Sequence, residues 1–106
     1  MQNIHSSEGF HKIGDNIYDA EAFQNNNQAF VDELIKWGSD NDAEVVFMVS
    51  SDGKCYCKHR FIEYDLDKLN ALENEFDAKV RREFPNAKST SIIAPVIIGH
   101  SLSMIA

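Results

Sequence analysis

The chain has 106 residues, 43% of them hydrophobic, and its 17 Asp and Glu outnumber 10 Lys and Arg to give a formal net charge of −7. This length predicts one domain with a single hydrophobic core. The negative charge repels phosphate backbones and anionic lipid surfaces, so nucleic acid and membranes are disfavoured as partners.

The N-terminal residues, the longest apolar stretch and the cysteine spacing all bear on the cellular compartment. Residues 1–8 lack the basic start and apolar run of a secretory signal. The most apolar stretch, Ile92 to Ile98, contains Pro95 and is far shorter than the roughly 20 residues of a spanning helix. Cys55 and Cys57 are too close along an extended chain to close an unstrained disulfide. We therefore expect a cytoplasmic protein with no membrane association.

The first part of the chain is compatible with two structures. We expect residues 1–9 to form a flexible N-terminus, followed by a turn at Gly14-Asp15-Asn16 and then a strand that contains Ile17 and Tyr18. Alternatively, Asp19 caps a helix that runs through Ala20, Glu21 and Ala22, which are good helix formers.

A helix is predicted next. Asn26 or Asn27 can cap its N-terminus, and Gly38 supplies a stop signal. Between them, apolar residues recur at helical spacing: Phe30, Val31, Leu34 and Ile35.

A β-hairpin follows around Asp52-Gly53, from a strand at residues 45–49 to a return strand at residues 54–64. A two-residue loop would mix apolar and charged side chains on one face. A three-residue loop with Gly53 in the left-handed conformation instead shifts the pairing by one residue and separates the apolar side chains from the charged ones. One face then holds Val45, Phe47, Val49, Cys55, Cys57, His59 and Phe61, and the other holds Tyr56, Lys58 and Arg60.

The last third of the chain predicts a helix and a strand. Asp65 caps a helix that ends before Pro85 and has one apolar stripe, formed by Leu66, Leu69, Leu72, Phe76 and Val80. Residues 89–98 are rich in β-branched residues and predict a strand, with Pro95 at an edge or a break. Residues 99–106 form a C-terminal tail or an extra strand.

This order of elements, β-α-β-β-α-β over residues 1–106, predicts a single α+β domain. It is the ferredoxin-like sandwich, in which an antiparallel sheet carries two helices on one face.

Cys55, Cys57 and His59 are the residues that come closest to a chemical site. Alternate strand residues lie about 7 Å apart, and no second cysteine pair exists to complete a tetrahedral zinc site. Cys57 and His59 point alike on a strand but seldom touch at that spacing. We interpret both cysteines as core residues and expect no catalytic residue, metal or cofactor. A thiol- or metal-dependent enzyme is an alternative.

Residues 54–61 form a basic strand that contains aromatic residues, at the place where an RNA-recognition sheet has its stacking residues. Only Lys54, Tyr56 and Phe61 agree with that motif, because Cys55 and Cys57 replace small residues and Lys58 replaces an aromatic one. A small RNA-binding domain is therefore a second alternative.

The function we expect is non-catalytic protein binding or regulation. A sharper version is an acidic inhibitor or immunity-type protein that covers a basic surface on its target. The candidate partner-binding residues are Tyr56, Lys58 and Arg60. From Ser89 onward the chain has no charged Asp, Glu, Lys or Arg, which favours a homodimer with candidate interface residues Ile97, Leu102 and Met104.

Overall fold

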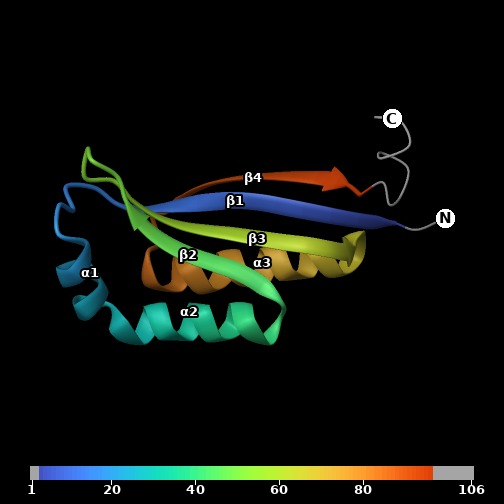
Figure 1. The fold of residues 1–106 in the computed structure, drawn as a ribbon, viewed down its shortest axis with the longest axis horizontal. Coiled ribbons are helices and arrows are strands. Elements are labelled where there is room, and N and C mark those ends of the chain that lie inside the picture. The colour runs from blue at the N-terminus through green and yellow to red at the C-terminus, as the bar shows by residue number, and fades with distance from the viewer. Residues whose placement is uncertain (1–2, 97–106) are drawn as a thin grey trace, which may run out of the picture.

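A computed structural model describes residues 3–96 (Figure 1). Along the chain the elements are β1 (Ile4–Gly14), α1 (Ala20–Asn26), α2 (Gln28–Asp40), β2 (Ala43–Val49), β3 (Cys55–Asp65), α3 (Leu66–Glu83) and β4 (Lys88–Pro95). The strands form one sheet in the order β2-β3-β1-β4, and every neighbouring pair is antiparallel. The domain is therefore α+β, as predicted.

The helices lie on one side of the sheet, and the other side carries no helix within residues 3–96 (Figure 1). Helix α2 packs on β2, and α3 packs on β1 and β3. The core lies between these two layers and consists of Ile13, Phe30, Leu34, Trp37, Cys55, Cys57, Phe61, Leu69, Leu72, Phe76, Val80 and Ala87.

The start of the chain differs from the prediction. Residues 4–9, expected to be flexible, belong to β1, which pairs with β3 on one side and β4 on the other. The strand was missed because its inward positions include the polar residues Ser7 and His11, which interrupt an apolar alternation. The strand expected around Ile17 is absent from the described residues, and the alternative is confirmed: Asp19 Oδ1 accepts a hydrogen bond of 3.1 Å from Ala22 N and caps α1.

Helix α2 also departs from the expected boundaries. Asn27 precedes it, but the Asn27 side chain donates to the Phe23 carbonyl at 2.9 Å and makes no capping bond to α2. The helix continues past Gly38 to Asp40. A Cβ atom at Gly38 would lie 2.9 Å from the Ala43 carbonyl oxygen, so this glycine permits close packing of α2 on β2 and does not end the helix.

The hairpin has the predicted register. Ser50 N donates to the Lys54 carbonyl at 2.9 Å, and Gly53 has a φ of 83°. Val49 lies opposite Cys55, and Phe47 lies opposite Cys57. The left-handed glycine therefore fixes which residues of β2 and β3 face the helices.

Helix α3 was also predicted correctly. Asp65 Oδ1 accepts a hydrogen bond of 2.9 Å from Lys68 N, and Leu69, Leu72, Phe76 and Val80 are buried.

Within residues 3–96, no helix is long and apolar enough to cross a bilayer.

Strand β4 is an edge strand that ends at Pro95, three residues earlier than predicted. A proline at the end of an edge strand costs no ladder hydrogen bond. The predicted tail at residues 99–106 and the candidate interface residues Ile97, Leu102 and Met104 lie outside the described residues.

Candidate functional site

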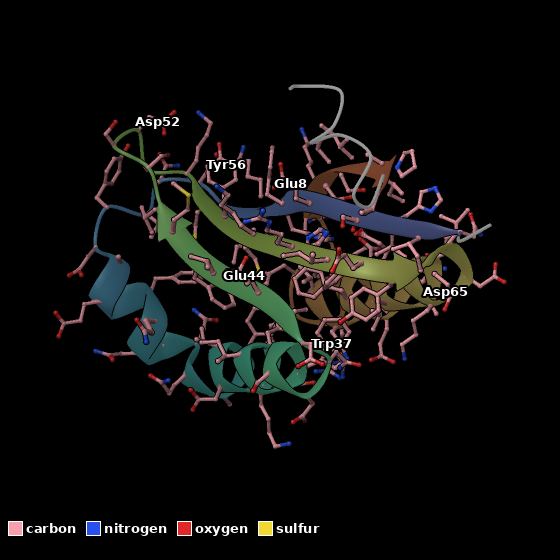
Figure 2. The ribbon with its side chains drawn as sticks, turned by 45° about the vertical axis from the view of Figure 1, so that its right-hand side comes forward. Glu8, Trp37, Glu44, Asp52, Tyr56 and Asp65 are labelled. Atoms are coloured by element: carbon pink, nitrogen blue, oxygen red, sulfur yellow. The ribbon has the colours of Figure 1, made fainter. Side chains whose placement is uncertain are left out.

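The side of the sheet that carries no helix, called here the open face, is the candidate site. Because strand side chains alternate, every second residue of each strand points to this side. The pairing register orders these residues from β2 to β4 in three rows: Met48, Tyr56, Lys12 and Lys88; Val46, Lys58, Phe10 and Thr90; Glu44, Arg60, Glu8 and Ile92. Figure 2 labels Glu8, Glu44 and Tyr56 among them.

The three predicted partner-binding residues all project from β3 onto the open face. The Tyr56 ring meets the Phe10 ring edge to face, with centroids 5.2 Å apart. Lys58 lies opposite Phe10, and Arg60 lies opposite Glu8. The sequence therefore placed these side chains together correctly, because the three-residue loop fixed the face of β3.

The apolar part of the open face was missed. Phe10, Val46, Met48 and Ile92 are 36%, 55%, 41% and 67% exposed. Phe10 escaped notice because β1 was not recognised as the neighbour of β3. Val46 and Met48 left a signal, since two of the three outward positions of β2 are apolar, as are its inward positions. Such a strand is expected when both faces of a sheet are covered.

The open face is hollowed rather than flat. A depression of about 520 Å³ is lined by charged residues, such as Glu8 and Lys58, and by apolar residues, such as Phe10, Val46 and Met48. Apolar area beside charged groups is a common composition of a protein-binding surface.

The charges of the open face differ from those of the whole chain. Lys12, Lys58, Arg60 and Lys88 lie there with only two carboxylates, Glu8 and Glu44, although the chain as a whole carries −7.

Two of these cations already have an ion-pair partner. Lys12 Nζ lies 2.8 Å from Asp15, and Arg60 Nη1 lies 3.7 Å from Glu44. Glu8, Lys58 and Lys88 have no ion-pair partner within residues 3–96. These charges are available to a binding partner.

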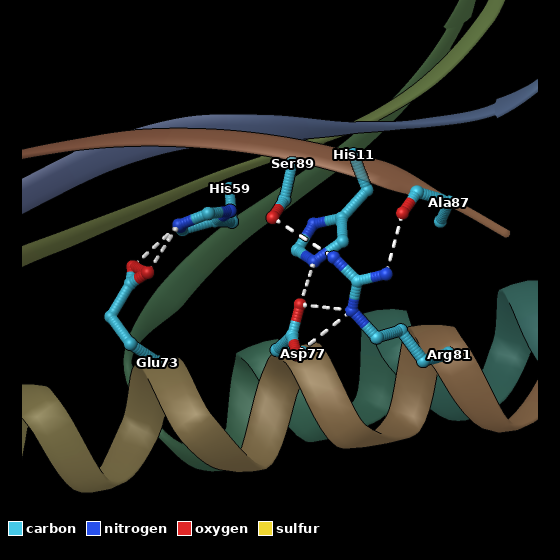
Figure 3. A network of polar contacts seen from close by, with 7 residues as sticks. All are labelled: His11, His59, Glu73, Asp77, Arg81, Ala87 and Ser89. Carbon is cyan, nitrogen blue, oxygen red and sulfur yellow. Dashed lines mark hydrogen bonds and ion pairs between the residues drawn. The ribbon is translucent and has the colours of Figure 1, made fainter. Parts of the chain in front are cut away.

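A second cluster lies on the other side of the sheet, between α3 and the strands β1, β3 and β4 (Figure 3). His11 and His59 are only 3% and 4% exposed. His11 Nε2 lies 2.7 Å from Asp77 Oδ1, and His59 Nε2 lies 2.7 Å from Glu73 Oε2. We call these four residues the histidine–carboxylate cluster. The sequence analysis did not find it, because its members come from three elements and β1 was not recognised.

Arg81 and Ser7 extend the cluster. Arg81 Nε donates to both oxygens of Asp77 at 3.0 Å, and Arg81 Nη1 donates to the Ala87 carbonyl at 2.6 Å. Ser7 Oγ donates to Glu73 at 3.1 Å. These hydrogen bonds link α3 to the sheet, whereas His11 Nδ1 and His59 Nδ1 are buried and have no hydrogen-bond partner among the described residues.

Burial and hydrogen bonding together shift the pKa values of His11 and Asp77. Desolvation lowers the pKa of His11 below 6.5 and outweighs the opposing hydrogen bond and charge of Asp77. Desolvation also works to raise the pKa of Asp77, but the hydrogen bonds from His11 and Arg81 outweigh it and lower that pKa. At neutral pH His11 is therefore neutral and donates its Nε2–H to an ionised Asp77.

The two cysteines lie in the core, as predicted, with exposures of 1% for Cys55 and 0% for Cys57. Burial raises the pKa of Cys55 to about 11 and that of Cys57 to about 12. Both thiols are therefore protonated at neutral pH and are weak nucleophiles. In the part of the chain that the structure describes, no three His, Cys, Asp or Glu residues are placed to hold a metal ion.

The agreement of residues 54–61 with an RNA-recognition strand weakens in the structure. Phe61 is 0% exposed and faces the helices, so it cannot stack on a base at the open face. Lys54 lies at the hairpin turn, where its Nζ is 2.8 Å from Asp52. Tyr56 alone keeps the place that the motif requires.

Comparison with known proteins adds evidence on the fold. No family model matches the chain, and no curated protein matches it. Among solved structures, it is similar to one described as "De novo designed protein Foldit4", with a TM-score of 0.52 and 12% identity. The match covers 89% of this chain and 98% of the designed one. At this identity the likeness shows the α+β fold alone.

Proposed function

We propose that this protein is a non-catalytic protein-binding module that contacts its partner through the open face. One observation carries the proposal. Of the eight large hydrophobic side chains that are exposed in residues 3–96, four are on this face, namely Phe10, Val46, Met48 and Ile92. Single exposed apolar residues are common, but several on one face beside unpaired charges are typical of an interaction surface.

We also infer that the topology is ferredoxin-like, with its first helix broken into α1 and α2 at Asn27. The strand order β2-β3-β1-β4 with antiparallel neighbours supports this inference. So does the position of the helices on one side only. This topology leaves one whole face of the sheet free for binding.

A protein fits the open face better than RNA. Glu8 and Glu44 flank Arg60 in one row and would repel a phosphate backbone there. Phe10 and Tyr56 meet edge to face, whereas base stacking requires open ring faces. Mixed apolar and charged residues are the usual content of protein interfaces.

The helical side of the molecule carries the acidic charge. Exposed carboxylates there include Glu21, Asp32, Asp40, Asp67, Glu75 and Glu83. These residues would attract a partner with a basic surface, which is the inhibitor-type version of the proposal. Because the cysteines are unpaired and buried, a reducing compartment such as the cytoplasm suits the chain.

Affinity capture with matched variants tests the use of the open face. The double variant Val46→Asp/Met48→Asp places charge in the apolar part of the face, and we expect it to lose proteins that the unmodified chain captures from its source cells. The control is Ile35→Asp on α2, because Ile35 is a comparably exposed apolar residue at 49% but lies on the helical side. Equal capture by all three proteins would show that the open face is not the binding surface.

A further inference from the structure

We propose that β4 pairs edge to edge with β4 of a second copy of this chain, so that the two sheets join into one continuous sheet. The contact is the free edge of the sheet and not the open face, so this inference goes beyond the proposed function. It is carried by the backbone groups that β4 turns away from β1 and by side chains that do not protect this edge.

The pairing with β1 determines which backbone groups of β4 are free. Val96 N donates to the Ile4 carbonyl at 2.8 Å, and β4 follows β1 in one unbroken register. In an antiparallel pair, every second residue turns its N–H and C=O to the neighbouring strand, and the residues between them turn both groups away. The residues of β4 that turn an N–H and a C=O to the free edge are Ser89, Ser91 and Ile93. Within residues 3–96, no strand pairs with this edge.

The side chains of β4 leave this edge unprotected. Edge strands that stay unpaired usually carry charges, a bulge or a proline. Lys88 at the first position is the one charged residue of β4, Pro95 lies at the last position, and no bulge interrupts the pairing with β1. All eight residues of the strand are exposed, and Ile92 and Ile93 are 67% and 41% exposed.

The helices leave room for a second strand. Figure 1 shows β4 at one border of the sheet, whereas β2 and the helix that packs on it, α2, lie at the other. Helix α3 packs on the two inner strands, β1 and β3. A second copy can therefore approach β4 in the plane of the sheet.

A two-fold axis beside Ser91, perpendicular to the sheet, uses all of the free groups. Ser91 then lies opposite Ser91 of the second copy, and Ser89 and Ile93 lie opposite each other on both sides of the axis. Each of these opposed pairs exchanges two hydrogen bonds. The axis keeps both open faces on the same side, so the open face continues from one copy to the other.

The neighbouring registers use fewer of these groups. In one of them Ser89 lies opposite Pro95, which has no N–H to donate. In the other, Ile93 lies opposite Ala87, whose N–H already donates to the Phe84 carbonyl at 3.0 Å. The register centred on Ser91 is therefore the one that we propose.

This register also suits two copies of the same chain. An isologous contact places the residue at the axis next to its own copy, and Ser91 is uncharged there. Lys88 lies opposite Ala94 and about 20 Å from Lys88 of the second copy, at roughly 3.3 Å per residue. On the open face Thr90 lies opposite Ile92, and two β-branched side chains form a favourable cross-strand pair.

Sedimentation velocity of the full chain from about 10 µM to about 1 mM tests the proposal. One strand from each copy buries less than the roughly 1,200 Å² at which stable interfaces begin, so we expect reversible dissociation at about 100 µM. The chain has a mass of 12.0 kDa, and the apparent mass should rise toward twice that value with concentration.

Charges placed at Ser91 test the position of the axis. Ser91→Lys and Ser91→Glu each set like charges opposite each other, and each should weaken association by about tenfold. An equimolar mixture of the two variants sets opposite charges there and should associate within about threefold of the unmodified chain. The matched controls are Ser39→Lys and Ser39→Glu, at an exposed position of α2, and both should leave association unchanged. Circular dichroism checks that every variant is folded.

Nuclear magnetic resonance gives a second measurement that needs no variant. The amide protons of Ser89, Ser91 and Ile93 should move downfield as the concentration rises, because they gain hydrogen bonds. The amide proton of Ile92 points to β1 and should move less.

Three results would overturn the inference. A mass of 12.0 kDa at every concentration would exclude a second copy at this edge. Association that neither Ser91→Lys nor Ser91→Glu weakens, or that leaves the three amide shifts unchanged, would place the contact elsewhere. The proposed function is judged separately, by the proteins that Val46→Asp/Met48→Asp fails to capture. That double variant changes β2 at the opposite border of the sheet and should still self-associate.

Discussion

His11 shows how one buried residue links packing to pH. It is 3% exposed, packs against the Phe76 ring with centroids 5.4 Å apart, and lies 2.7 Å from Asp77. His59, Arg81 and Asp77 are the titratable or charged groups that act on it. Since desolvation dominates, the folded protein holds this imidazole in its neutral form.

The resulting prediction concerns acid stability. The folded pKa of His11 lies below 6.5, near which the unfolded chain titrates, so the unfolded state binds more protons as the pH falls. The stabilisation is complete above pH 6.5 and declines as the pH falls through and below that value. Urea unfolding should therefore show a smaller free energy of unfolding at pH 5.5 than at pH 7.5. In His11→Gln, which keeps a donor for Asp77, this loss should shrink.

The same pH dependence in the unmodified chain and in His11→Gln would show that His11 does not cause it. The comparison is made above the range in which Asp77 titrates, because the lowered pKa of Asp77 removes stability only below about 3.8.

At the scale of elements, the hairpin and α3 could be predicted because local signals agreed with the tertiary structure. The Asp52-Gly53 turn and the Asp65 cap each fix a boundary through backbone chemistry. Strand β1 could not be predicted, because its inward Ser7 and His11 are hydrogen-bonded to Glu73 and Asp77, which are 66 positions away in each case. A local pattern cannot report such distant partners.

The open face was only partly predictable for the same reason. Alternation on β3 identified Tyr56, Lys58 and Arg60, but Phe10 and Glu8 join them only through the pairing of β1 with β3. Gly38 was misread as a helix stop because the sequence does not show that the Ala43 backbone lies close to it.

Phe76 tests the packing of α3 on the sheet. Its side chain is 0% exposed, and its ring packs against those of His11, Trp37, His59 and Phe61. Phe76→Ala should lower the free energy of unfolding by about 3–5 kcal/mol, because it leaves a cavity where two layers meet. The control is Ala78→Gly, at an exposed position of the same helix. It should lower the free energy of unfolding by only about 1 kcal/mol. A loss below about 1 kcal/mol for Phe76→Ala would contradict this account of the core.

For the whole molecule, the helices cover one side of the sheet, and the other side carries no helix within residues 3–96. The two sides differ in charge as well as in cover, since exposed carboxylates gather on the helices and cations gather on the open face. The molecule thus has two chemically distinct surfaces, and apolar residues such as Phe10, Val46 and Ile92 are grouped on the second.

The most direct test of this account is a nuclear magnetic resonance titration of the full chain with a protein that it captures from its source cells, in which backbone amide shifts are followed as the captured protein is added. We expect the shifts that change to cluster on residues 8–12, 44–48 and 56–60, which carry the open face on three neighbouring strands. The amides of α2 and the outer side of α3 should stay constant. Changes confined to the helices, with none on these three strands, would contradict the claim that the open face is the binding surface.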